Sequence, residues 1–299
     1  MQPSSESASA RPTLAQGRLC IVLAALMWST SGAFTKALTQ ETPLQLNTPA
    51  VAPLQIAFFR VIFAGLALLP LLRKEDISFR PLMLPMAGCF AVMNATFVLA
   101  MAAGTAANAI FLQYTAPMWM FLACVWWLGE PCDRRGLVAL AIGLVGLLAI
   151  VAGGWQEDHL DIVGLGLGSG LAYAGVVIFL RLLKDESSRW LIVLNLLCSG
   201  LVLLPWVCLP LPSPGQLALL IVYGAGQMSV PYWLMARGVR TISPQEAGII
   251  TLIEPLLNPV WTYLMSREEP SWFTVAGGGC ILAALAWRYW PVGRSPNQT

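Results

Sequence analysis

A glutamate lies in the middle of a stretch that is otherwise almost entirely apolar. The stretch reads TLIEPLLNPVW over residues 251–261, and it is flanked by GII and TYLM. Ser243 can cap the start of a helix, and Glu254 then lies about 16 Å along the helix axis. That depth is close to the middle of a hydrocarbon core about 30 Å thick. An ionisable residue at such a depth is a candidate for substrate binding or proton transfer.

Arg60 is a second charged residue inside an apolar stretch, at a depth that agrees with that of Glu254. Two hypotheses follow for these intramembrane charges. Either the two side chains form a buried ion pair, or Glu254 faces a cavity and binds a substrate amino group or a proton. We favour the cavity, because Thr251 and Asn258 extend the same polar helix face and Pro255 frees a backbone carbonyl beside it.

Polar and aromatic residues recur at helical spacing in several other apolar stretches. Such side chains normally face protein or water rather than lipid. Interhelical hydrogen bonding is the alternative for the small polar residues, and interfacial anchoring is the alternative for Trp28 and Tyr232. The pattern predicts a substrate cavity lined by Trp28, Ser31, Thr35, Phe90, Asn94, Phe97, Gln113, Tyr173, Met228, Tyr232, Thr251, Glu254 and Asn258.

Two prolines interrupt apolar stretches at similar places in the two halves of the chain. Pro117 and Pro255 each remove the hydrogen bond to the carbonyl four residues earlier. Backbone left unsatisfied in this way is tolerated beside a cavity or a neighbouring helix. We predict that both prolines act as hinges, with a static kink as the alternative.

Enzymatic chemistry finds little support among the remaining residue types. The one histidine, His159, lies in an acidic segment, and the sequence contains no HExxH, GxSxG or CxxC motif. A P-loop is also missing, which excludes an ATP-driven pump. We therefore expect no catalytic residues, no metal ligands, no cofactor and no nucleic-acid partner.

The elements that must position these residues follow from the composition. Of the 299 residues, 57% are hydrophobic and 11% are charged, against about 25% charged in soluble domains. Mean hydropathy is +0.70. A membrane-crossing helix needs about 20 apolar residues, and ten such runs are present, at 19–39, 52–72, 82–102, 106–128, 136–152, 162–183, 190–208, 216–236, 244–265 and 271–290.

The basic residues alternate between the loops that join these spans. With the N-terminus inside, only Lys36 and Arg267 fall outside, and the loop at 153–161 is acidic. Cytoplasmic loops collect Lys and Arg, so we expect both termini in the cytoplasm. Fourteen of the 17 basic residues then lie inside: Arg11, Arg18, Arg73, Lys74, Arg80, Arg134, Arg135, Arg181, Lys184, Arg189, Arg237, Arg240, Arg288 and Arg294.

The two halves of the sequence resemble each other. FAGLALLP (63–70) matches LCSGLVLLP (197–205), and NAIFLQYTAPMW (108–119) matches EAGIITLIEPLL (246–257). Each half has five spans, an odd number, so the second copy crosses the membrane the other way up. We expect a cytoplasmic tail at 1–18, five-helix repeats at 19–152 and 162–290, and a second cytoplasmic tail at 291–299.

The five-plus-five arrangement, RVIFAGLALLP at 60–70 and Glu254-Pro255 together resemble the drug/metabolite transporter superfamily. Within it the chain is similar to the EamA-type ten-helix carriers. The resemblance implies an all-α integral membrane protein with ten transmembrane helices, arranged as two inverted five-helix repeats around a central cavity. It also implies alternating access, with spans 1, 3, 4, 6, 8 and 9 as the cavity wall. The branch that we favour is the YddG-type bacterial exporters of aromatic and neutral amino acids.

The expected function is export of small neutral or zwitterionic metabolites across a bacterial inner membrane. Only Arg60 is clearly a cation within the spans, which disfavours strongly anionic substrates. A multidrug, organic-cation or nucleotide-sugar carrier on the same fold is the alternative, and an intramembrane enzyme is the alternative of another class. The expected partners are a small-molecule substrate and the lipid bilayer, with a proton as a candidate coupling ion and a monomer as the functional unit.

Overall fold

The computed structural model describes residues 13–127, 129, 131, 133–156, 159–207 and 210–290. Most of the predicted N-terminal tail, at 1–12, and the predicted C-terminal tail, at 291–299, lie outside the described residues, and their prediction stays open. The same holds for two residues of the acidic loop, Glu157 and Asp158.

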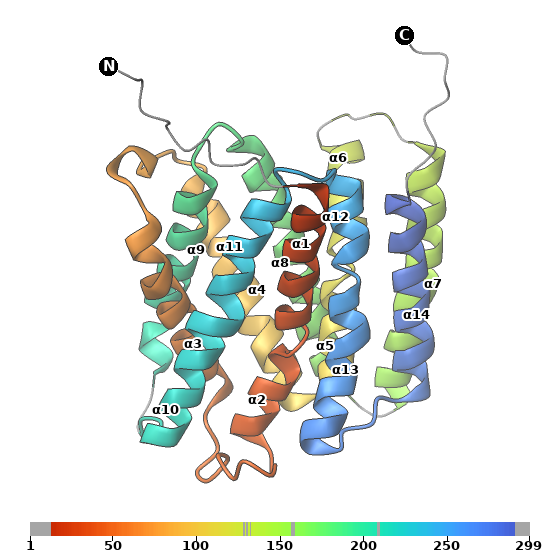
Figure 1. Cartoon of the computed structure of the whole chain (residues 1–299). Coiled ribbons are helices and arrows are strands. Elements are labelled where there is room, and N and C mark those ends of the chain that lie inside the picture. The colour runs from red at the N-terminus through yellow and green to blue at the C-terminus, as the bar shows by residue number, and fades with distance from the viewer. Residues whose placement is uncertain are drawn as a thin grey trace, which may run out of the picture.

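The first half of the chain forms five helical rods, two of which are interrupted (Figure 1). Short 3-10 turns, η1 (Leu69–Leu71) and η2 (Lys74–Asp76), follow the second rod. The five rods are α1 with α2 (Leu14–Trp28 and Ser31–Thr39), α3 (Pro53–Leu68), α4 (Met83–Ala103), α5 with α6 (Ala106–Gln113 and Ala116–Trp126), and α7 (Arg134–Gln156).

The second half forms five more rods. Because the total is even, the described chain begins and ends at the same end of the bundle (Figure 1). A 3-10 turn, η3 (Leu204–Trp206), follows α9, and a π-helix, η4 (Val222–Ser229), joins α10 to α11. The rods are α8 (Leu160–Leu182), α9 (Ser188–Leu203), α10 with α11 (Pro214–Ile221 and Val230–Gly238), α12 with α13 (Pro244–Ile250 and Ile253–Ser266), and α14 (Trp272–Tyr289).

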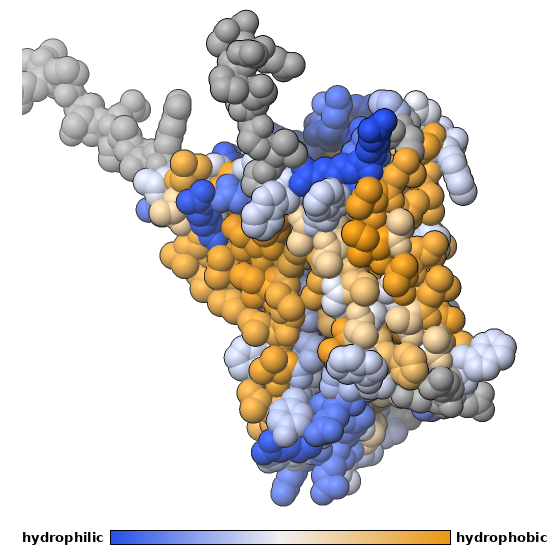
Figure 2. Space-filling model, turned by 90° about the vertical axis from the view of Figure 1, so that its right-hand side faces the viewer, coloured by the Kyte–Doolittle hydropathy of each residue, from blue (hydrophilic) through white to orange (hydrophobic). Residues whose placement is uncertain are grey.

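The rods have the length and surface of membrane spans. Eight helical stretches within the described residues are long and apolar enough to cross a bilayer. The last two rods run beside them but are less apolar, because α12 and α13 carry Glu246 and Glu254 and α14 ends at Arg288 and Tyr289. Figure 2 shows an apolar band between polar ends on the side formed by α7 and α14, and α7 exposes Leu144, Val145 and Leu148 there.

The packing of the rods has the symmetry expected of two inverted repeats. The repeats match α4 with α11 and α8 with α1. The structure accordingly packs α4 against α8, and the matching pair α11 against α1. Two further pairs, α3 with α9 and α7 with α14, map onto themselves. The fold is therefore the predicted one: an all-α membrane protein of two inverted five-helix repeats.

Matched glycines permit the closest of these contacts. Gly65 on α3 and Gly200 on α9 are partners in the sequence repeat, and a methyl group on either would overlap the opposite helix, at Leu197 and Ile62 respectively. Between α7 and α14, Gly146 and Gly277 lie directly against each other's backbone. Small residues let membrane helices approach closely, and van der Waals contact then stabilises the pair.

Candidate functional site

A cavity of about 130 Å³ lies between the two repeats. Polar, charged and aromatic side chains from α1, α2, α3, α4, α5, α8, η4, α11 and α13 converge on it. Eight of the residues predicted to line a cavity are on its wall: Trp28, Ser31, Phe97, Gln113, Tyr173, Met228, Tyr232 and Glu254.

Five residues predicted for the cavity wall do not line it. Thr35 is buried, with its hydroxyl 3.1 Å from both the Ser31 carbonyl and the Tyr223 hydroxyl. Phe90 packs into an apolar cluster with residues of α3 and α9. These placements correct the predicted lining of the cavity. On α4, Met93 and Phe97 face the cavity, and Phe90 does not.

The other three corrected residues make hydrogen bonds between or within helices. Asn94 donates to the Ala57 carbonyl at 3.0 Å, and Asn258 donates to the Ser31 hydroxyl at 3.0 Å. Thr251 donates to the Gly248 carbonyl of its own helix at 2.9 Å. Asn94 and Asn258 thus have the alternative role, hydrogen bonding between helices.

Arg60 lies on the cavity wall and is almost fully buried. Its Nε donates to Asn94 Oδ1 at 2.8 Å, and its Nη1 donates to the Tyr223 hydroxyl at 2.9 Å. Its guanidinium carbon also lies 5.6 Å from the ring centre of Phe97. Neutral acceptors and an aromatic face therefore hold this cation and leave further N–H groups for a ligand.

Glu254 lies on the cavity wall in the first turn of α13. The Tyr114 hydroxyl donates to its Oε2 at 2.9 Å. A carboxylate in the first turn is favoured by the helix dipole. Glu254 and Arg60 form no ion pair among the described residues although both line one cavity, so the structure supports the cavity hypothesis over the ion pair.

Both predicted hinge prolines follow a break in their rod. Pro117 lies in the first turn of α6 and Pro255 in the first turn of α13, and each follows a gap of two residues in the helix. The freed carbonyl of Thr251 accepts a hydrogen bond from the Tyr114 hydroxyl at 3.1 Å. Tyr114 itself lies at the break between α5 and α6, so it joins the α5–α6 rod of one repeat to the α12–α13 rod of the other.

Sequence analysis missed three residues of the cavity wall: Met93, Tyr114 and Gln227. Gln227 donates to the Trp28 carbonyl at 3.0 Å, at the break between α1 and α2. A signal for Tyr114 was available, because it lies within four residues before Pro117, where a helix break exposes several successive side chains. No comparable signal marks Met93, which is one apolar residue among many.

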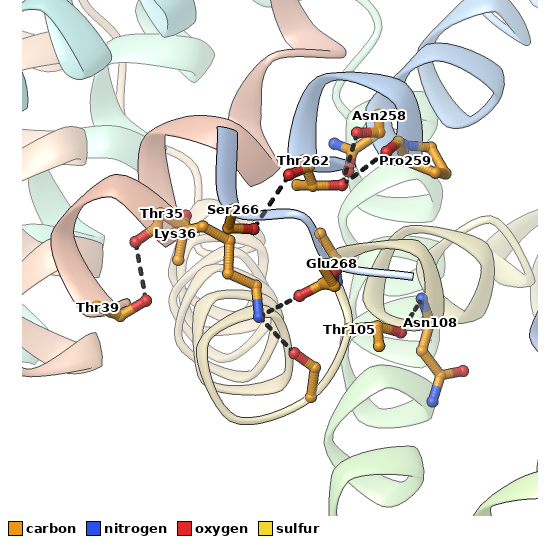
Figure 3. Close-up of polar contacts among 12 residues, drawn as sticks. Thr35, Lys36, Thr39, Thr105, Asn108, Asn258, Pro259, Thr262, Ser266 and Glu268 are labelled. Carbon is orange, nitrogen blue, oxygen red and sulfur yellow. Dashed lines mark hydrogen bonds and ion pairs between the residues drawn. The ribbon is translucent and has the colours of Figure 1, made fainter. Parts of the chain in front are cut away.

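A buried ion pair lies at the end of the bundle opposite the described chain termini (Figure 1), and Figure 3 shows its contacts. Lys36 of α2 lies 2.5 Å from Glu268, which follows α13, and also donates to the Gly104 carbonyl at 2.6 Å. Glu268 accepts a further hydrogen bond from the backbone N–H of Ala106 at 2.7 Å. The lysine side chain is 0% exposed and the glutamate 10%. This cluster ties α2, the α4–α5 turn and the α13–α14 loop together. It is called the outer lock below, because the orientation predicted from the basic residues places this end outside.

Comparison with known proteins identifies the family. The sequence profile of the EamA-like transporter family matches residues 15–152 and again residues 162–290. The chain belongs to the EamA-like transporter family. The protein is thus a membrane transporter, and the names of its relatives below describe transporters rather than enzymes.

Three relatives show how varied this family is. An uncharacterized transporter of Archaeoglobus fulgidus is 29% identical over 91% of this chain and 96% of its own length. The pseudopaline exporter CntI of Pseudomonas aeruginosa is 26% identical over 91% of this chain and 95% of its own. An S-adenosylmethionine uptake transporter of Rickettsia prowazekii is 22% identical over 77% and 80%.

Proposed function

We propose that this EamA-like transporter is a secondary carrier that exports small zwitterionic metabolites, foremost aromatic and other neutral amino acids. One observation carries the proposal. A single small cavity between the repeats presents the cation Arg60, the anion Glu254 and the aromatic side chains of Trp28, Phe97, Tyr173 and Tyr232.

Each part of an amino acid finds a matching group in this cavity. The unused N–H groups of Arg60 suit a carboxylate, because charge-assisted hydrogen bonds to guanidinium are strong. Glu254 suits the ammonium group, which would replace the Tyr114 hydroxyl as its partner. The rings of Trp28 and Tyr232, 5.4 Å apart at their centres, offer an apolar surface for the side chain.

The alternative substrates fit this cavity less well. Sites for drug-sized ligands span about 300–1,000 Å³, whereas this cavity holds about 130 Å³. Nucleotide sugars also call for several cations around their phosphates, and among the described residues Arg60 is the one cation that lines this cavity. An organic cation would bring no counter-charge to Arg60 and would be repelled by it.

Alternating access is the proposed mechanism, with the structure closed at the outer lock. Two of the interrupted rods, α5 with α6 and α12 with α13, serve as hinges at Pro117 and Pro255, and Tyr114 couples them. A proton on Glu254 is a candidate for coupling, and the monomer is the proposed unit. The relatives carry names for both export and uptake, and we propose export for this chain.

The basic residues support a bacterial inner-membrane protein with both termini in the cytoplasm. Of the described basic residues, Arg73, Arg189, Arg237 and Arg240 gather at the end of the bundle where the described chain begins and ends. Reporter domains fused at residues 1 and 299 should both report a cytoplasmic location. A periplasmic reporter at either end would overturn this orientation.

Counterflow in proteoliposomes tests the function. Vesicles loaded with each of the twenty amino acids, or with one of several organic cations, receive the same compound in labelled form outside. We expect labelled aromatic amino acids to accumulate transiently, because a carrier exchanges labelled for unlabelled substrate. Glu254→Gln should weaken the accumulation but leave a measurable signal, and Glu41→Gln, which alters an exposed acid near the outer end, should leave it unchanged. Accumulation of organic cations alone would overturn the amino-acid proposal.

A further inference from the structure

A second cavity, of about 670 Å³, lies at the end of the bundle opposite the outer lock. It is lined by residues of α3 and η1, of α9 and of α11. α3 packs against α9, and α11 borders the same cavity, on the left of Figure 1. The charge distribution assigns this end to the cytoplasm. This cavity is called the basic groove below.

Four arginines form the mouth of the basic groove. Arg73 follows η1, Arg189 lies in the first turn of α9, and Arg237 and Arg240 lie at the end of α11. Arg189 is 3.4 Å from the carboxylate of Asp76. Within the described part of the chain, Arg237 and Arg240 form no ion pair with any carboxylate. The mouth therefore holds an excess of positive charge.

Apolar side chains form the wall beneath these arginines. The wall is made of Leu68, Leu71, Leu72, Ile192, Val193 and Trp233. Leu71 is 44% exposed and Trp233 is 42% exposed, so part of this wall faces the surroundings of the bundle. Arg237 lies 4.8 Å above the ring centre of Trp233 and is thus held over the apolar surface. The groove therefore combines a cationic rim with a partly exposed apolar wall.

We propose that the basic groove binds an anionic phospholipid of the cytoplasmic leaflet. The phosphate would contact Arg237 and Arg240, and an acyl chain would lie along Leu71 and Trp233. Basic pockets between membrane helices on the cytoplasmic side suit such headgroups. A free inorganic anion needs neither the exposed apolar wall nor a space of about 670 Å³. The phospholipid accounts for the charge, the apolar wall and the volume together.

This site is separate from the proposed substrate site but touches it. Tyr232 is the one described residue that lines both cavities. It also packs against Trp28 across the substrate cavity. A bound lipid would therefore lie against a residue that also lines the substrate cavity.

Native mass spectrometry of the full-length protein tests the lipid site. The protein is titrated with phosphatidylglycerol or with phosphatidylcholine of the same acyl chains. The double variant Arg237→Gln, Arg240→Gln is compared with Arg134→Gln, Lys184→Gln, which removes the same charge from the same end outside the groove. We expect phosphatidylglycerol to bind the native protein and the control equally. Each groove arginine contributes about fivefold near an anionic surface, so the groove variant should bind it about 30-fold more weakly.

Three results would overturn the proposal. Equal affinity of the groove and control variants for phosphatidylglycerol would show that the groove does not bind it. Equal binding of phosphatidylcholine would show that charge plays no part. A soluble anion would be the ligand of the groove if two results were found together. Millimolar glycerol phosphate would displace the lipid, and glycerol phosphate alone would raise the Tm of the protein as much as phosphatidylglycerol does. Circular dichroism of each variant confirms that it is folded, and none of these results depends on transport activity.

Discussion

Neutralising the acid of the outer lock should open the transporter toward the outside. Glu268→Gln keeps the size of the side chain and can still accept the hydrogen bond from Ala106, but it leaves Lys36 without a counter-charge. Removing one partner of a buried ion pair costs about 3–5 kcal/mol. Lys36 retains the Gly104 carbonyl at 2.6 Å, so we expect about 3 kcal/mol, the lower end of that range.

That free energy is lost only in the state in which the outer lock is formed. The equilibrium between closed and open outer ends should therefore move toward the open form by roughly 100-fold. The assay is labelling of Gln113→Cys, on the cavity wall, by a membrane-impermeant maleimide added outside, in a background without native cysteines. We expect the labelling rate to rise at least tenfold. The rise stays below the shift in the equilibrium, because the rate levels off once the open form predominates.

Two variants separate gating from general instability. Glu41→Gln changes an acid that is exposed at the same end and should label like the native protein. Lys36→Met combined with Glu268→Gln removes both charges, so labelling should stay fast while the Tm recovers. A low Tm with an unchanged labelling rate in Glu268→Gln would refute the reasoning, because the pair would then be structural only.

Three further predictions concern the hinge and the cytoplasmic loops. Tyr114→Phe removes the hydroxyl that donates to the Glu254 carboxylate, whereas the Thr251 carbonyl retains the Glu254 N–H at 3.0 Å. The free energy of unfolding in denaturant should therefore fall by about 1–3 kcal/mol, while Tyr263→Phe on the exposed face of α13 should match the native protein. Pro255→Ala restores a helical hydrogen bond and should change cysteine accessibility of the cavity from both sides; unchanged accessibility would indicate a static kink. Hydrogen bonds from the Ser78 hydroxyl and from Arg80 lower the pKa of Glu186, so its contribution to stability is complete above the unfolded pKa of about 4.3 and is lost as pH falls through the folded value. The Tm of Glu186→Gln should thus lie below that of the native protein at pH 7 and meet it below about pH 4; a constant gap would contradict this.

The spans and the repeat could be predicted from the sequence because both are local properties. Apolar runs of about 20 residues are visible without any contact information. The glycines Gly65 and Gly200 could be paired from the sequence repeat alone, and the structure packs them at the contact of α3 with α9. Prolines at fixed positions likewise predicted where helical hydrogen bonds would be lost, and the helix breaks precede Pro117 and Pro255.

The polar contacts could not be predicted because they join residues far apart in the sequence. Arg60 donates hydrogen bonds to Asn94 and Tyr223. It does not pair with Glu254, as the alternative hypothesis would have it, and no periodicity in the sequence identifies such partners. Lys36 was recognisable only as a basic residue on the unexpected side, whereas its partner Glu268 lies in a distant loop. The face of α4 that lines the cavity is also shifted by one residue from the face predicted by helical spacing. Met93 therefore lines the cavity, and Asn94 lies behind the wall where the sequence predicted it to line the cavity.

The most direct test of a cavity for zwitterions is competition by substrate analogues that lack one charge. Counterflow of labelled phenylalanine is measured against unlabelled phenylalanine, 2-phenylethylamine, which lacks the carboxylate, and 3-phenylpropionate, which lacks the ammonium group. Arg60 and Glu254 on one wall predict that phenylalanine competes far better than either analogue. They also predict that Glu254→Gln removes most of its advantage over 3-phenylpropionate. Equal competition by all three compounds, in the native protein and in the variant, would contradict the proposed site.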